Sequence, residues 1–146
     1  MDPTIIIDSL PSLLNATLMT IVLAGISIVI ALIIGFFTAI VRIVKVKILN
    51  EIANIYVSII RGTPLLVQIF VIYYGLPQIG IALDPISSGI LALSLNAGAY
   101  LSESFRASIL AVDNGQMEAS MAMGMTYSQA LRRIILPQSL RIAIPT

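Results

Sequence analysis

The side chains best suited to chemistry in this sequence are a few polar residues set within long apolar runs. Four of them lie in two neighbouring runs: Gln68, Asn96, Tyr100 and Glu103. The last three share one face of a helix predicted over residues 85–112, where they present an amide, a hydroxyl and a carboxylate within two turns. Charged groups inside a membrane span cost about 2.5–3.5 kcal/mol on insertion scales, so they tend to face cavities. This face is therefore a candidate substrate path.

A structural role for the same face is the alternative. Glu103 lies three residues before Arg106, so the two side chains can pair across one helical turn near the membrane boundary. Asn96 and Tyr100 would then form hydrogen bonds between helices. The residue types alone leave both possibilities open.

The residues that are missing exclude most enzyme chemistry. The chain of 146 residues has no Cys and no His, which removes thiol nucleophiles, imidazole acid–base catalysis, disulfides and most zinc sites. It contains no phosphate-binding G-x-x-x-x-G-K-[ST] loop and no nucleophile–base arrangement. The net charge of +1 gives no electrostatic signature for nucleic acid. We therefore expect no enzyme, no cofactor, no metal and no nucleic-acid partner.

The composition indicates an all-α, multi-pass membrane protein. Apolar residues make up 58% of the chain and charged residues 10%, against roughly 25% charged in soluble domains. The stretch from Ser9 to Val41 contains 33 residues without a charge, whereas a bilayer core needs about 20. We predict a single transmembrane domain over residues 1–146, a helix bundle with about three spans. These spans cover approximately residues 15–41, 64–83 and 85–112.

The second predicted span is interrupted. Thr63 and Pro64 suit the N-cap and first position of a helix, and Gly75, Pro77 and Gly80 break the outer end of the run. Interrupted spans in transporters often border the substrate site. The alternative, a helix that simply ends at the surface at Pro77, fits the pattern equally well.

Two further helical patterns flank this span. Before it, residues 51–60 place Asn54 on a polar side and isoleucines on the other, as in a helix at the membrane interface or packed on the bundle. After it, Asp84 and Pro85 suit the start of the third span. Small residues then recur every four positions and predict a face for close helix contact. They are Ser94, Gly98 and Ser102.

The distribution of basic residues predicts the orientation. Arg42, Lys45 and Lys47 follow the first span directly, none lies between the second and third spans, and four lie from Arg106 to Arg141. Basic residues beside a span mark the cytoplasmic side. The N-terminus is therefore expected outside, and the segment after the third span inside.

That inner segment has the pattern of a helix–glycine–helix elbow. Residues 117–123 suit a short helix, and Gly124 interrupts it because glycine adopts positive φ at little cost. Thr126 and Gln129 have the spacing of a capping box for a second helix. Pro137 would end or kink that helix, whose apolar face carries three residues. These are Leu131, Ile134 and Ile135.

Two motifs resemble a known family. The first motif resembles the EAA loop of permease subunits of ATP-binding-cassette importers, with Ser120 in place of an alanine. It consists of Glu118-Ala119-Ser120, three further residues, Gly124, nine further residues, Ile134, one further residue and Leu136-Pro137. Residues 61–68, RGTPLLVQ, are similar to the polar-amino-acid branch of these permeases. The likeness runs from about residue 10 to the last residue.

The resemblance implies a transmembrane subunit of an ATP-driven importer of polar amino acids in the bacterial inner membrane. Residues 113–137 would form the cytoplasmic coupling loop, and residues 117–137 of it would dock to a separate ATPase that hydrolyses the ATP. The coupling residues would be Glu118, Ala119, Gly124, Leu136 and Pro137. Other expected partners are a second permease chain, identical or different, an extracytoplasmic amino-acid-binding protein and membrane lipid. For an amino-acid substrate, Glu103 would lie nearest the ammonium group.

Residues 140–146 begin a further apolar segment, and the family carries two more spans at this point. We therefore expect the chain to be incomplete at its C-terminus. Two other functions remain open: a self-contained channel or secondary transporter, and a membrane anchor that recruits a cytoplasmic partner.

Overall fold

The computed structural model describes the backbone of residues 3–144 and the side chains of residues 9–144. Within that part of the chain every regular element is helical, which confirms the predicted all-α fold. The elements are α1 (Pro3–Val44), α2 (Lys47–Gly62), α3 (Leu65–Phe70), the π-helical turn η1 (Val71–Gly75), the 3-10 turn η2 (Leu76–Ile79), α4 (Pro85–Leu110), α5 (Asn114–Ala122), α6 (Tyr127–Ala130), the π-helical turn η3 (Leu131–Ile135) and α7 (Leu136–Ala143). The final two residues of the predicted C-terminal apolar segment lie outside the described residues.

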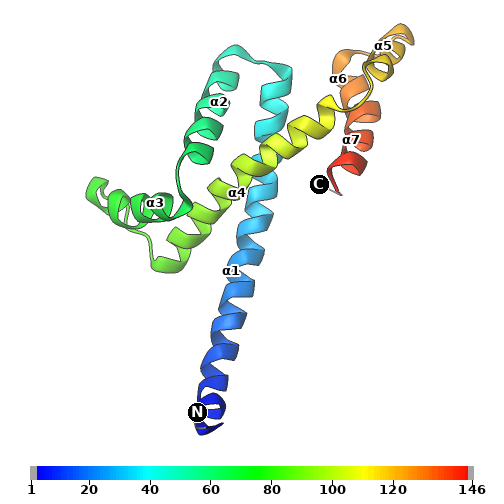
Figure 1. Cartoon of the computed structure of the whole chain (residues 1–146). Helices are drawn as coiled ribbons and strands as arrows, with labels where there is room; N and C mark the ends of the chain where they lie inside the picture. The colour runs from blue at the N-terminus through cyan, green and yellow to red at the C-terminus, as the bar shows by residue number, and fades with distance from the viewer. Residues whose placement is uncertain (1–2, 145–146) are drawn as a thin grey trace.

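The first helix is the longest element of the described residues, with 42 residues against 26 in α4. Figure 1 shows α1 extending far beyond the other helices towards the N-terminus, with α4 crossing its upper half. The stretch Ser9–Val44 is long and apolar enough to cross a membrane, and most of its large apolar side chains are exposed. An exposed apolar helix of this length matches a bilayer environment rather than water.

The crossing of α1 and α4 is the main packing contact, and small residues make it possible. Ser94, Gly98 and Ser102 are all buried on α4, which confirms the predicted face for close helix contact. The Ser94 hydroxyl donates a hydrogen bond to the Ser27 carbonyl of α1, at 3.3 Å. The Ser102 hydroxyl donates to the Ala99 carbonyl at 2.7 Å, so both serines of this face have a backbone acceptor for the buried hydroxyl.

Two glycines bring the backbones of this crossing together. A β-carbon on Gly35 of α1 would lie 2.8 Å from the Leu101 Cβ and 3.0 Å from the Gly98 carbonyl oxygen. A β-carbon on Gly98 would lie 2.9 Å from the Ile34 Cγ2. Neither position has room for a larger side chain, as expected where transmembrane helices pack through small residues.

The second helix confirms the predicted helix over residues 51–60. Ala53 and Val57 are the buried residues, and Asn54, on the predicted polar side, accepts a hydrogen bond from Arg42 Nε at 2.8 Å. The small side chains allow α2 to approach its neighbours closely. The isoleucines on the opposite side of the helix are exposed: Ile52, Ile55 and Ile59.

The predicted second span, residues 64–83, starts next to a sharp bend in the chain. Residues 47–62 and 65–79 meet at an angle of 110°, as in a broken span or a re-entrant loop. The predicted interruptions hold: a π-helical turn ends at Gly75, Pro77 lies in the first turn of η2, and Gly80 has a φ of +88°. Thr63 does not cap α3; its hydroxyl donates to the Ile59 carbonyl at 2.9 Å and closes the end of α2 instead.

The fourth helix begins as its sequence predicts. Asp84 is the N-cap, and its carboxylate accepts from the backbone N–H groups of Ile86 and Ser87, each at 3.1 Å. The Ser87 hydroxyl also donates to this carboxylate at 2.6 Å, and this bond is the main reason that the pKa of Asp84 is lowered. The helix is 26 residues long, about 39 Å, so it has the length for a span. The boundaries of the second and third spans stay predictions.

Candidate functional site

The elbow after α4 is built around Gly124. The backbone of Gly124 has a φ of +86°, a left-handed conformation that glycine adopts without the Cβ clash of other residues. On one side, α5 begins at the N-cap Asp113, whose carboxylate accepts from Gly115 N–H at 2.7 Å. On the other, Thr126 and Gln129 form the predicted capping box, with bonds of 3.3 and 2.9 Å. The predicted helix–glycine–helix turn is thus present, with its first helix starting earlier, at Asn114.

A small apolar cluster fixes the elbow to the end of α4. Ile109 and Val112 from that end pack with Leu131 and Ile135, all of them at most 8% exposed. Met117 and Ile134 pack around this cluster. The apolar face predicted for the second elbow helix is therefore turned towards α4, so the elbow and α4 are joined by a buried apolar contact.

Pro137, predicted to end or kink the second elbow helix, does not end it. Residues 131–135 form a π-helical turn, in which the Leu136 N–H bonds to the Leu131 carbonyl, and α7 continues from Leu136 to Ala143. Because proline has no N–H, a local distortion of this kind lets the helix pass through it. The distortion lies just before Pro137, in residues 131–135.

The residues proposed for coupling divide into surface and core. Glu118, Ala119, Gly124 and Pro137 are exposed, while Leu136 is half-buried and packs on the apolar cluster. Ser120 is buried, and its hydroxyl donates to the Gln116 carbonyl at 2.6 Å. A serine is accommodated at this alanine-like position because its own helix satisfies the hydroxyl.

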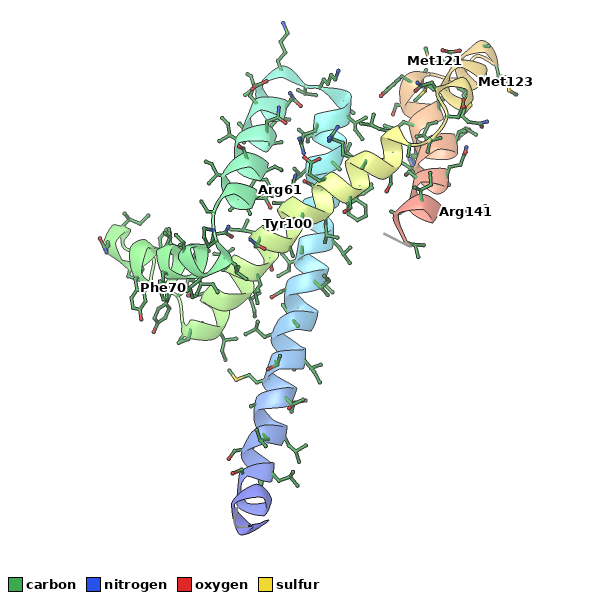
Figure 2. The ribbon with its side chains drawn as sticks, in the orientation of Figure 1. Arg61, Phe70, Tyr100, Met121, Met123 and Arg141 are labelled. Carbon is green, nitrogen blue, oxygen red and sulfur yellow. The ribbon has the colours of Figure 1, made fainter. Side chains whose placement is uncertain are left out.

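Sequence reasoning missed the methionines of the elbow. Figure 2 shows Met121 and Met123 at the tip of the elbow, and their exposed fractions are 52% and 84%. Methionine side chains are flexible and polarisable, and they are frequent at adaptable binding surfaces. The signal was present in the sequence as methionines spaced around Gly124.

The polar residues of the candidate path fall into two contacts. In the first, Gln68 is buried, and its side-chain amide donates to the Ile60 carbonyl at 2.8 Å and the Thr63 carbonyl at 3.1 Å. Its oxygen accepts from Asn96 Nδ2 at 3.2 Å. The structure therefore brings Gln68 and Asn96 together, and Gln68 also satisfies backbone carbonyls freed where α2 meets α3.

The second contact centres on Glu103. One carboxylate oxygen accepts from Arg42 Nη1, and the other accepts from Arg106 Nη2 at 3.1 Å and Nε at 3.2 Å. Arg61 Nη1 lies 3.8 Å from the first oxygen. The predicted Glu103–Arg106 pair is thus present, together with two arginines that sequence reasoning did not connect to it. Because Arg42 is on α1 and Arg61 on α2, Glu103 ties three helices together.

Arg61 and Tyr100 form the open edge of this cluster. The Arg61 guanidinium carbon lies 5.3 Å from the centroid of the Tyr100 ring, a cation–π distance, and Figure 2 shows the two side by side. The Tyr100 residue is 49% exposed and the Arg61 side chain 43%. With three arginines around one glutamate, the cluster carries an excess of two positive charges.

Comparison with known proteins agrees with the fold and the motifs. Residues 31–146 match the family described as binding-protein-dependent transport system inner membrane component. The chain is 43% identical to the probable amino-acid ABC transporter permease protein PatM of Vibrio harveyi, over 96% of this chain and 64% of PatM. It is 47% identical to the L-cystine transport system permease protein TcyB of Bacillus subtilis, over 92% of this chain and 58% of TcyB. The chain therefore spans less than two thirds of either relative.

A solved structure shares the architecture. It is a crystal structure of an amino acid ABC transporter with histidines, which superposes with a TM-score of 0.90 at 36% identity, over 99% of this chain and 68% of the other. The family match begins within α1 and the structural match covers nearly the whole chain, so both include the elbow. The chain belongs to the family of inner membrane components of binding-protein-dependent transport systems.

Proposed function

We propose that this chain is part of the transmembrane subunit of an ATP-driven importer of polar amino acids in a bacterial inner membrane, with its N-terminus outside. Support comes from the family match and from relatives named for amino-acid and L-cystine transport. The observation that carries the proposal is the exposed elbow at Gly124, held against α4 by its own apolar cluster.

The elbow suits coupling to a separate ATPase for a physical reason. Residues 117–137 present an exposed carboxylate at Glu118 and exposed methionines at Met121 and Met123, which a partner groove can bury. The buried contact with α4 makes the elbow move together with that helix. When the ATPase subunits close on ATP, docked elbows would carry α4 with them and rock the helices from inward-open to outward-open.

We propose further partners on the same basis. A second permease chain, identical or different, would complete the pore, and an extracytoplasmic amino-acid-binding protein would deliver the substrate. The face with Gln68, Asn96, Tyr100 and Glu103 would line the path. Because arginines occupy both oxygens of Glu103, that carboxylate would meet a substrate ammonium only after one of them moves away. The exposed pair of Arg61 and Tyr100 would be the first polar groups that the substrate meets.

The test is whether the elbow couples ATP hydrolysis to uptake. Gly124→Val in the full-length permease, assembled with its ATPase, should leave the membrane level of the permease intact and abolish ATP-dependent uptake. Gly80→Val is the matched control, because both glycines have positive φ and no heavy atom within 4 Å of an added β-carbon, so the backbone strain is alike. Normal uptake in Gly124→Val, or equal loss in both variants, would reject the coupling role.

The same system separates the other two functions. A channel or secondary transporter would move the amino acid without the ATPase, so ATP-independent uptake would favour it. An anchor would retain the ATPase in a pull-down and transport nothing. Glu118→Ala should weaken ATPase retention, whereas Glu51→Ala, another exposed glutamate outside the elbow, should not.

A further inference from the structure

An apolar hollow opens between α1 and α2, apart from the elbow and from the Glu103 cluster. It has a volume of about 360 Å³ and runs from Val41 and Leu49 to Tyr56 and Leu95. Apart from Thr38 and Tyr56 its lining side chains are hydrocarbon, and the Tyr56 hydroxyl is already bonded to the Leu95 carbonyl at 2.6 Å. The hollow therefore suits an apolar chain and offers few groups to a polar ligand.

Basic residues lie at one end of this hollow. Lys45 and Lys47 are in the turn between α1 and α2, where Lys45 has a φ of +56°, and the lining residues Val41 and Leu49 flank that turn in the sequence. Neither lysine forms an ion pair within the described residues. From residue 41 to residue 56 the chain has three basic residues and one acidic residue, Glu51.

In the turn between α1 and α2, the basic side chains without an ion-pair partner among the described residues are the two lysines. Arg42, the third basic residue, is only 14% exposed at its side chain, and Glu103 and Asn54 already accept its hydrogen bonds. Lys45 and Lys47 are exposed. An apolar groove with unpaired cations at one end has the complementarity of an anionic amphiphile, because the tail replaces water and the headgroup meets the charge.

We propose that this hollow binds one anionic phospholipid, with an acyl chain along α1 and α2 and the headgroup phosphate at Lys45 and Lys47. Phe37 and Ile52 are 63% and 59% exposed at the groove, so a lipid chain would cover apolar surface that the described fold leaves open. The lysines favour a lipid over an apolar protein segment as the occupant, because only the anionic headgroup adds an electrostatic attraction at Lys45 and Lys47.

Tryptophan fluorescence tests the site directly, because the chain contains no Trp. Phe37→Trp places a single reporter in the groove with a conservative exchange of one aromatic ring for another. Val29→Trp is the control, an exposed α1 position outside the groove. Each purified protein is reconstituted in vesicles of phosphatidylcholine with a minority of phosphatidylglycerol, and brominated acyl chains are carried by one lipid or the other.

The reporter at Phe37 should be quenched more strongly by brominated phosphatidylglycerol than by the same mole fraction of brominated phosphatidylcholine, while the control shows no difference. Lys45→Gln and Lys47→Gln in the reporter background should lower this preference roughly fivefold for each lysine. The corresponding arginine variants should keep it. Equal quenching by the two lipids would overturn the proposal, and so would the absence of quenching by either, since protein would then cover the groove.

Discussion

Replacing Gly35 by alanine should weaken the packing of α1 on α4. The added β-carbon would lie 2.8 Å from the Leu101 Cβ, 3.0 Å from the Gly98 carbonyl oxygen and 3.2 Å from the Ser102 nitrogen. Two of these three atoms belong to the backbone of α4, and the third is a β-carbon. No rotamer change can relieve such contacts, so the two helices would have to move apart.

The size of the effect follows from two opposing terms. Forcing an extra carbon into a packed contact costs about 1–3 kcal/mol. Alanine in place of glycine returns up to about 1 kcal/mol of helix propensity. The steric term is larger here because backbone atoms are involved, and we expect a net loss of about 1–2 kcal/mol. At Gly25 on the same helix nothing lies within 4 Å of an added β-carbon, so Gly25→Ala should be neutral or slightly stabilising.

Thermal unfolding of the purified variants in the same detergent measures this difference. Gly35→Ala should unfold at a lower temperature than the parent protein, and Gly25→Ala at the same or a higher temperature. If both variants shift equally, the change reflects helix propensity or membrane insertion, and the close crossing of α1 and α4 does not control stability.

Three further predictions concern orientation and the polar contacts. Because the chain has no cysteine, Ser9→Cys and Ser87→Cys should react with an impermeant thiol reagent on intact cells, and Ser128→Cys only after permeabilisation; outside labelling of Ser128→Cys would reverse the proposed orientation. Gln68→Leu removes the donors to two carbonyls at the α2–α3 break and should lower stability by about 2–3 kcal/mol, read from thermal unfolding, where an unchanged midpoint would contradict this. Glu103→Gln should reduce the yield of assembled transporter, because the arginines lose their counter-charge, and should alter the amino-acid selectivity of what assembles, because Glu103 is proposed to line the path; unchanged selectivity would leave Glu103 a purely structural role.

The parts of the fold that the sequence predicted are those set by neighbours in the chain. Asp84 caps α4, and Thr126 and Gln129 form a capping box, because in each case donor and acceptor lie within three residues. The small face of α4 was predictable for a similar reason, since residues four apart share a helix face. Helix identity and the Gly124 turn follow from such local terms.

The features that could not be predicted from the sequence depend on the angle at which helices meet. Thr63 has the local pattern of an N-cap for α3, but it bonds back to α2 because the chain turns sharply there. The local pattern placed Asn54 on a polar helix side but gave no sign that Arg42 of α1 would bond to it. Arg42 and Glu103 are 61 residues apart, and no local pattern encodes their meeting.

Both structural contacts that a coupling mechanism needs are carried by one helix. The C-terminal end of α4 holds the elbow through Ile109 and Val112, and its middle holds α1 through the crossing at Gly98. Glu103 lies between them on the same helix and ties it to Arg42 of α1. A displacement at the elbow can therefore reach α1 without an intervening loop, because packed cores transmit strain rather than absorb it. The break between α2 and α3 is bonded to the same helix, because Asn96 of α4 donates to Gln68 at 3.2 Å, so a displacement of α4 reaches that region as well.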